Sequence, residues 1–178
     1  MIHDVAVAIR RLQAGGALRK ALVVDTDVHQ GNGTAAIFAD DAGVFTVSLH
    51  QENNYPEPKP PSDLDVNLED GTGDEEYLDL LHKALADSFG RFVPEMLFYI
   101  GGADPYREDQ LGGLWLSMRG LQERDALVFA EARRRGLPVA VAFAGGYARK
   151  VEDTVRIHVN TVIAAREAAA ARASGANP

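Results

Sequence analysis

The sequence predicts an α/β fold in which a parallel sheet is covered by helices on both faces. Short runs of β-branched and other apolar residues, typical of strands buried on both sides, alternate with longer segments whose apolar residues recur at helical spacing. This alternation of strands and helices favours a parallel sheet. The 178 residues, 46% of them hydrophobic, are enough for one domain with a real core. We therefore expect a single unit over residues 1–178.

The N-terminal part of the chain predicts one helix and two strands. Asp4 is a suitable N-cap for the helix, and Gly15 and Gly16 end it. Compact apolar runs at residues 21–24 and 44–49 predict buried strands. The apolar residues of the helix recur at helical spacing: Val5, Ala8, Ile9 and Leu12.

Residues 51–72 predict a long loop, because prolines, asparagines and aspartates crowd this stretch. Loops of this length are more often functional than not. Beyond the loop, helices and strands alternate: helix 74–89, strand 96–100, helix 116–135, strand 138–144 and helix 153–173. The sheet is therefore expected to contain four strands.

Composition narrows the classes of function. The formal net charge is -8, whereas nucleic-acid-binding proteins usually carry a basic surface. An acidic protein is compatible with a cationic partner such as a lysine side chain. No apolar run is long enough to cross a bilayer, and no signal peptide opens the chain. Cysteine is absent, so any metal would have oxygen and nitrogen ligands. We expect a soluble, cytoplasmic protein that binds neither nucleic acid nor membrane.

Polar residues with metal-binding chemistry follow the ends of the predicted strands. Asp25, Asp27 and His29 come directly after the first strand, and alternate side chains of an extended segment point the same way. Asp104 follows the third strand and Tyr147 follows the fourth. In a parallel sheet, ligands bind where the loops leave the carboxyl ends of the strands. The sequence therefore predicts a site at this edge of the sheet.

Two carboxylates and one imidazole would hold a divalent cation and leave a coordination position open for a substrate. This set of ligands does not choose strictly between zinc, iron, cobalt and manganese. Tyr147 could donate a hydrogen bond to an oxyanion that forms at the metal. The residues alone leave a simpler interpretation open, in which the aspartates end a strand, His29 is an ordinary loop residue and Tyr147 is a packed aromatic.

Five segments of the sequence resemble the histone deacetylases and their bacterial relatives, in order and over nearly the whole chain. They are residues 24–34 (VDTDVHQGNGT), 48–51 (SLHQ), 70–74 (DGTGD), 102–105 (GADP) and 145–147 (GGY). Residues 53–56 and 61–65 are most similar to the class IV branch of that family. The resemblance implies the arginase and deacetylase type of α/β fold. It further implies the carboxy-terminal half of the catalytic domain, without the family's opening strands.

The resemblance also implies roles for individual residues. Asp27, His29 and Asp104 match the family's zinc ligands, where Fe²⁺ or Co²⁺ could replace zinc. Tyr147 matches the tyrosine that polarises the substrate carbonyl. Three residues match a monovalent-cation site that is usually filled by K⁺, the first of them also supporting a catalytic histidine: Asp25, Ser48 and Leu49. Three others match the wall of the substrate tunnel: Leu111, Gly145 and Gly146.

By resemblance, the reaction is the zinc-dependent hydrolysis of an acyl-lysine amide on a protein, or of a small acylated amine. One feature departs from the family. Its general base and acid are two adjacent histidines that precede the first aspartate motif, whereas the five histidines of this sequence are all isolated. We therefore expect the chain alone to be a weak or inactive deacylase.

Two other functions stay open at this point. An apolar strand followed by Asp25 and Asp27 also suits a haloacid-dehalogenase-like phosphatase, with Asp104 and Asp109 as its magnesium-binding acids, although no suitably placed lysine supports it. The chain could instead be a non-catalytic metal-binding remnant, or one half of a split protein that needs another chain. A sheet of that kind would expose an edge through which it could associate.

Overall fold

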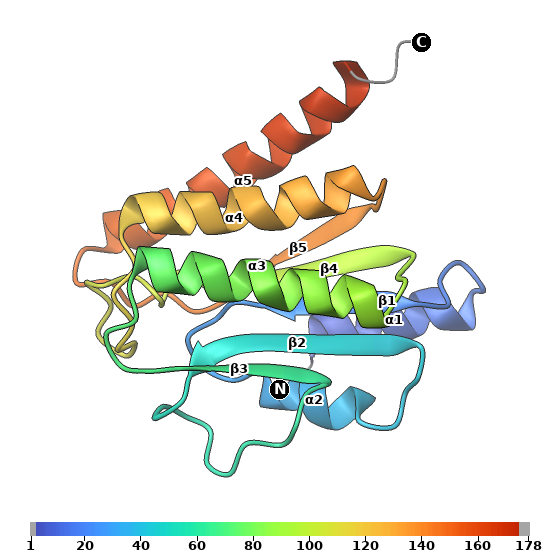
Figure 1. Ribbon diagram of the computed structural model, residues 1–178, viewed down its shortest axis with the longest axis horizontal. Coiled ribbons are helices and arrows are strands. Elements are labelled where there is room, and N and C mark those ends of the chain that lie inside the picture. Colours follow the sequence, from blue (N-terminus) through green and yellow to red (C-terminus); the bar gives the residue numbers. More distant parts are fainter. Residues whose placement is uncertain (1–2, 175–178) are drawn as a thin grey trace.

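A five-stranded parallel sheet forms the centre of the protein (Figure 1) in the computed structural model, which describes residues 3–174. The strands lie in the order β3-β2-β1-β4-β5, and each neighbouring pair is parallel. The predicted α/β fold with a parallel sheet is therefore confirmed. The strands are β1 (Ala21–Asp25), β2 (Val44–Gln51), β3 (Leu64–Leu68), β4 (Met96–Gly101) and β5 (Val139–Phe143).

Helices cover both faces of this sheet. In Figure 1, α3, α4 and α5 lie on one face, whereas α1 and α2 lie on the other. The helices are α1 (Asp4–Ala14), α2 (Asn32–Phe38), α3 (Asp74–Arg91), α4 (Met118–Arg134) and α5 (Val151–Ser174). Across the described residues 3–174, no helix combines the length and the apolar character that a membrane span requires.

Alternate residues of the central strand β1 fill two separate cores. Leu22 and Val24 pack in a cluster with side chains of α3, α4 and α5. Ala21 and Val23 point to the opposite face and pack in a cluster with side chains of α1 and α2. This division follows from the two-residue period of side chains along a strand. Because both faces are covered, β1 is a continuous apolar run rather than an alternating one.

The register of the strands aligns their carboxyl ends. Asp25, the last residue of β1, lies opposite Ser48 of β2 and Ile100 of β4. Gly101, the last residue of β4, lies opposite Phe143 at the end of β5. The loops that follow these strands therefore start close together, at the edge where open α/β sheets bind their ligands.

The loop expected at residues 51–72 contains a strand, so that part of the prediction is wrong. Leu64–Leu68 forms β3 and pairs with the end of β2, which makes five strands rather than four. The apolar and polar residues of β3 alternate, as is typical of a half-buried strand. The neighbouring prolines, which favour turns, conceal this signal in the sequence.

The beginnings of two helices also differ from expectation. Gly31 and Gly33 predict only a tight turn, but α2 begins between them and buries Phe38 in the core. His3, and not Asp4, caps α1, because its Nδ1 accepts a hydrogen bond from the Ala6 N–H at 3.2 Å. The predicted end of α1 is confirmed at Gly15 and Gly16, the latter with a left-handed φ of 70° that favours glycine.

Replacement of Leu22 by alanine should destabilise the protein by about 2–5 kcal/mol, because this fully buried side chain would leave a cavity in the core. Urea unfolding followed by circular dichroism measures the change. Val93→Ala is a suitable control, since Val93 is 77% exposed and its truncation should alter the free energy of unfolding by less than about 0.5 kcal/mol. Similar losses for both variants would contradict the packing of β1 described above.

Candidate metal centre

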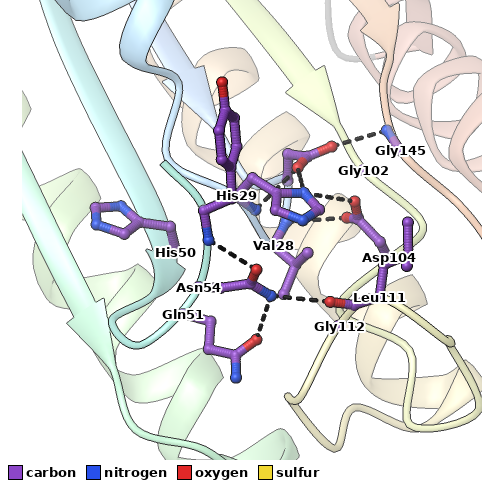
Figure 2. Close-up of polar contacts among 12 residues, drawn as sticks. Val28, His29, His50, Gln51, Asn54, Gly102, Asp104, Leu111, Gly112 and Gly145 are labelled. Atoms are coloured by element: carbon purple, nitrogen blue, oxygen red, sulfur yellow. Dashed lines mark hydrogen bonds and ion pairs between the residues drawn. The ribbon is translucent and has the colours of Figure 1, made fainter. Parts of the chain in front are cut away.

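The loops that leave β1 and β4 bring three side chains to one point. Asp27 and His29 follow β1, Asp104 follows β4, and one ligand atom from each lies within 4.8 Å of the others. Figure 2 shows the His29 ring facing the Asp104 carboxylate. Nδ1 of His29 lies 3.0 Å from Asp27 Oδ1 and 3.5 Å from Asp104 Oδ2. The structure therefore brings together all three residues that the sequence predicts as metal ligands.

Asp25 is not one of the converging ligands, but it holds the backbone that carries them. Its Oδ1 accepts a hydrogen bond from the Asp27 N–H at 3.0 Å, and Asp27 Oδ1 in turn accepts one from the His29 N–H at 2.9 Å. Aspartates commonly make such bonds to the backbone two residues on, and these bonds stabilise turns. The segment after β1 is therefore a pair of turns rather than a continued strand.

Two glycines make room for the carboxylates. A Cβ atom on Gly145 would lie 2.0 Å from Asp104 Oδ2, and one on Gly102 would lie 2.6 Å from Asp104 Oδ1 and from Asp27 Cα. The Gly145 N–H also donates a hydrogen bond to Asp27 Oδ2 at 2.7 Å (Figure 2). The loop after β5 thus contacts the acids that follow β1 and β4. A residue with a side chain at Gly102 or Gly145 would clash with these acids.

Burial and mutual repulsion perturb the acids of this site. Burial raises the pKa of Asp104 to about 6, with the Asp27 charge adding to the effect, and burial raises the pKa of Asp25 well above its usual value. Burial alone would also raise the pKa of Asp27, but hydrogen bonds from His29 and from the Gly145 N–H lower it. The carboxylates of Asp104 and Asp27 raise the pKa of His29 to about 10. The site therefore attracts positive charge strongly.

One oxygen is free to act as a ligand. Asp104 is fully buried, and its Oδ2 has no hydrogen-bond donor, since His29 Nδ1 approaches it only at an ion-pair distance. A buried carboxylate oxygen without a partner is costly unless a cation compensates it. Two carboxylates and an imidazole at this spacing fit a divalent metal ion. An open pocket of about 500 Å³, large enough for a small organic group, lies beside Asp27 and His29 and is also lined by residues of α1, α2 and β5.

A buried arginine, which the sequence does not single out, anchors the two ligand loops. Nη1 of Arg124 in α4 donates a hydrogen bond to the Gly102 carbonyl oxygen at 2.6 Å and lies 3.4 Å from the Thr26 carbonyl oxygen. Arg124 also pairs with Asp125, which accepts hydrogen bonds from the Tyr99 hydroxyl and from Thr161 Oγ1. All of these groups are buried, so the network connects β4, α4 and α5 to the ligand loops.

Comparison with known proteins identifies the family. Residues 1–162 match the family model described as the histone deacetylase domain. The chain belongs to the histone deacetylase family. This result confirms the resemblance that the sequence motifs show.

Comparisons with individual proteins agree with this result. An uncharacterised protein of Picosynechococcus sp. is 42% identical over 167 residues, which cover 94% of this chain and 56% of that protein. Histone deacetylase 2 of Arabidopsis thaliana is 32% identical over 145 residues, 78% of this chain and 38% of that protein. A solved histone deacetylase homologue from Aquifex aeolicus matches with a TM-score of 0.78 and 27% identity, over 92% of this chain and 46% of that one. The chain spans about half the length of the relatives that it matches.

The residues predicted for the tunnel wall (Leu111, Gly145 and Gly146) and the residue predicted to polarise the carbonyl (Tyr147) lie on two loops beside the site. Leu111 and Tyr147 are about half exposed, on the loops that follow β4 and β5. Asn54 Nδ2 donates hydrogen bonds to the Leu111 carbonyl oxygen at 2.9 Å and to Gln51 Oε1 at 2.8 Å (Figure 2). The proline-rich loop is thus tied to the rim by Gln51 and Asn54, two residues whose role the sequence does not reveal. The tunnel and oxyanion roles stay predictions.

The residues predicted for the monovalent-cation site lie deeper, at the ends of β1 and β2. Asp25 and Ser48 are register partners, and both are buried together with Leu49. Ser48 Oγ meets the Gly31 N–H at 3.3 Å and His50 Nδ1 at 3.0 Å. The three residues are therefore adjacent, whereas the identity of a bound ion stays a prediction.

Asp109, one of the two acids that the phosphatase alternative requires as magnesium ligands, makes its contacts away from the metal centre. Asp109 does not belong to the group of converging ligand atoms within residues 3–174. Its carboxylate accepts hydrogen bonds from the backbone N–H groups of Leu111, Gly112 and Tyr147. This geometry favours the deacetylase interpretation over the phosphatase one.

Arg124→Met should destabilise the protein by about 3–5 kcal/mol, because it leaves the buried Asp125 charge without its partner. The loss is measured as a shift of the urea unfolding curve. Arg119→Met is the matched control on the same helix: its ion pair with Glu123 is exposed, so the curve should barely move. A small effect of Arg124→Met would show that the buried network does not hold the ligand loops.

Proposed function

We propose that Asp27, His29 and Asp104 hold zinc and that this site hydrolyses acyl-lysine amides. The observation that carries the proposal is the convergence of one ligand atom from each residue within 4.8 Å. Two carboxylates and one imidazole leave coordination positions for substrate and water, as a catalytic site requires. The same donors would accept Fe²⁺ or Co²⁺.

Bound zinc would polarise the carbonyl group of the substrate and lower the pKa of a bound water molecule. The residues of this chain orient the substrate around it. The Tyr147 hydroxyl donates a hydrogen bond to the developing oxyanion. Leu111 and the Gly145–Gly146 backbone line the tunnel that receives the aliphatic part of the lysine side chain. K⁺ between Asp25, Ser48 and the Leu49 carbonyl would neutralise the buried Asp25 charge. The cation would thereby offset the burial that, together with the Asp27 charge, raises the pKa of Asp25.

The substrate class is an amide of a long aliphatic amine, either acyl-lysine on a protein or a small acylated amine. The names of a relative and of the matching family support this class, because both describe deacetylases. The motifs at residues 53–56 and 61–65 favour the class IV branch, and the absence of cysteine fits a cytoplasmic protein.

We further propose that turnover by the chain alone is weak. A general base and a general acid each contribute about 10²-fold to 10⁴-fold in rate, and this sequence has no adjacent pair of histidines to provide them. Zinc affinity does not depend on those groups. Metal binding and hydrolysis are therefore separable measurements.

Asp104→Asn should weaken Zn²⁺ binding at least about tenfold, since it removes one anionic ligand from a set of three. Isothermal titration calorimetry measures the affinity, and an acetyl-lysine peptide assay should show slow hydrolysis that chelator abolishes. The control is Asp79→Asn, which removes an exposed acid of α3 that pairs with Lys83 and should leave zinc affinity unchanged. Zinc binding that is insensitive to Asp104→Asn would refute the metal site, and rapid hydrolysis by the chain alone would refute the weak turnover.

An exposed apolar surface favours the related proposal that the chain associates with another polypeptide. Within residues 3–174, β5 pairs with β4 alone and so lies at the edge of the sheet. Phe143 of β5 is 55% exposed and contacts the His158 ring of α5 at 4.7 Å between centroids. We define the β5–α5 face as these exposed apolar residues: Val141, Phe143, Val151, Val155, Val159, Val162 and Ile163.

The occupant that we propose for the β5–α5 face is a polypeptide that adds a strand to β5 and packs apolar side chains on α5. Edge strands present unpaired N–H and C=O groups that pair readily with an added strand. A contiguous apolar patch beside such an edge marks an interaction site. The relatives, about twice as long as this chain, contain further polypeptide of the length that this role requires.

Val155→Glu with Val159→Glu should abolish a complex between this chain and the part of the Picosynechococcus relative that lies outside the match, after coexpression of the two. The charges would be buried without partners in the complex. Affinity purification followed by size-exclusion chromatography measures the amount of 1:1 complex. Val93→Glu, an exposed apolar position away from α5, is the control. Absence of the complex, or its persistence in the double variant, would argue against this surface.

A further inference from the structure

A buried carboxylate outside the metal centre joins the two loops at its rim. Asp109 is 7% exposed. Its Oδ1 accepts hydrogen bonds from the N–H groups of Leu111 and Gly112, at 2.8 and 3.0 Å. Its Oδ2 accepts a hydrogen bond from the Tyr147 N–H at 2.6 Å. One side chain therefore satisfies three backbone donors on segments that are more than 30 residues apart in sequence.

The backbones around Asp109 are already aligned with each other. Asp109 and Ala148 form an antiparallel bridge. The Gln110 N–H donates to the Tyr147 carbonyl oxygen at 3.2 Å, and the Arg149 N–H donates to the Glu108 carbonyl oxygen at 3.0 Å. These backbone bonds hold the two loops together, and the Asp109 carboxylate adds hydrogen bonds to both the Leu111 turn and Tyr147.

The loops that Asp109 joins present side chains that have much less support of their own. The Leu111 and Tyr147 side chains are about half exposed, in contrast to the buried carboxylate behind them. The Leu111 turn also rests on a metal ligand, since a Cβ atom on Gly112 would lie 2.2 Å from the Asp104 carbonyl oxygen. Both side chains are therefore positioned mainly through their backbones.

We propose that Asp109 is a positioning residue that places Tyr147 and the Leu111 turn over the metal centre. It acts on substrate only through those residues, so its effect on catalysis rests on the proposed deacylase function. A carboxylate suits this role because both of its oxygens accept hydrogen bonds, and charged acceptors bind N–H groups more strongly than neutral ones. Asparagine cannot replace it, since its NH₂ group would face one of the N–H donors.

Amide hydrogen exchange tests how Asp109 holds the loops. In Asp109→Asn, NMR should show at least about tenfold faster exchange at Leu111, Gly112 and Tyr147, with protection in β1 and β4 unchanged. Glu108→Gln is the matched control, because it removes the same charge from the exposed neighbouring residue. If Asp109→Asn does not fold, Asp109→Glu keeps the charge but moves it by one methylene, and the same three amides should lose protection. Unchanged exchange at Tyr147 in the folded variant would overturn the proposal.

Ligand binding to the Co²⁺-loaded chain tests the consequence for the site. Acetohydroxamic acid, titrated by visible absorption, presents a carbonyl oxygen to Tyr147 beside the metal. Asp109→Asn and Tyr147→Phe should each weaken its binding about tenfold without changing Co²⁺ affinity, and the double variant should be no weaker than Tyr147→Phe. Additive losses would overturn the coupling of Asp109 to Tyr147. If Tyr147→Phe alone has no effect, the proposed role of Tyr147 fails, and the exchange measurement still decides whether Asp109 holds the loops.

Discussion

The parallel register of β1 and β4 is the constraint on which the site depends. Because Asp25 lies opposite Ile100, the loops that follow the two strands start at the same level and reach each other within a few residues. Asp27, His29 and Asp104 then share one volume, in which Asp104 is fully buried and the other two side chains are partly buried. Burial, with the Asp27 charge adding to it, raises the pKa of Asp104 to about 6, and the carboxylates of Asp104 and Asp27 raise the pKa of His29 to about 10. The electrostatics of the site and the geometry of the sheet thus have one origin.

The central part of this arrangement can be predicted from the sequence because it has strong local signals. β1, β2 and β4 are buried on both faces, so β1 and β4 are mainly apolar runs, and β2 begins with apolar residues interrupted only by Thr46 and Ser48. The proposed ligands Asp27 and Asp104 follow such runs directly, and the parallel fold then implies that they meet. β3 lacks this advantage. It is a half-buried edge strand near prolines, and its pairing with β2 decides its conformation more than its own composition does.

The supporting shell of the site could not be predicted, because its contacts are long-range and made to backbone atoms. Arg124 lies in the middle of a helix, and nothing in the sequence indicates that its partners are the carbonyl oxygens of Gly102 and Thr26. Asp109 reaches an amide of a loop 38 residues further on. Hydrogen bonds to main-chain atoms do not constrain the identity of the partner residue, so they leave no pattern for sequence analysis to detect.

The main-chain contacts of Arg124 have a consequence for how such a site can change. An anchor that binds carbonyl oxygens tolerates replacement of the neighbouring side chains, as long as the loops keep their path. A new donor could therefore be installed at His29, whose side chain holds no backbone group within the described residues 3–174, whereas the Asp27 carboxylate also accepts hydrogen bonds from the His29 and Gly145 N–H groups. Protein engineers who wish to alter the proposed metal site can keep the Arg124–Asp125 pair unchanged and vary the loops that it anchors.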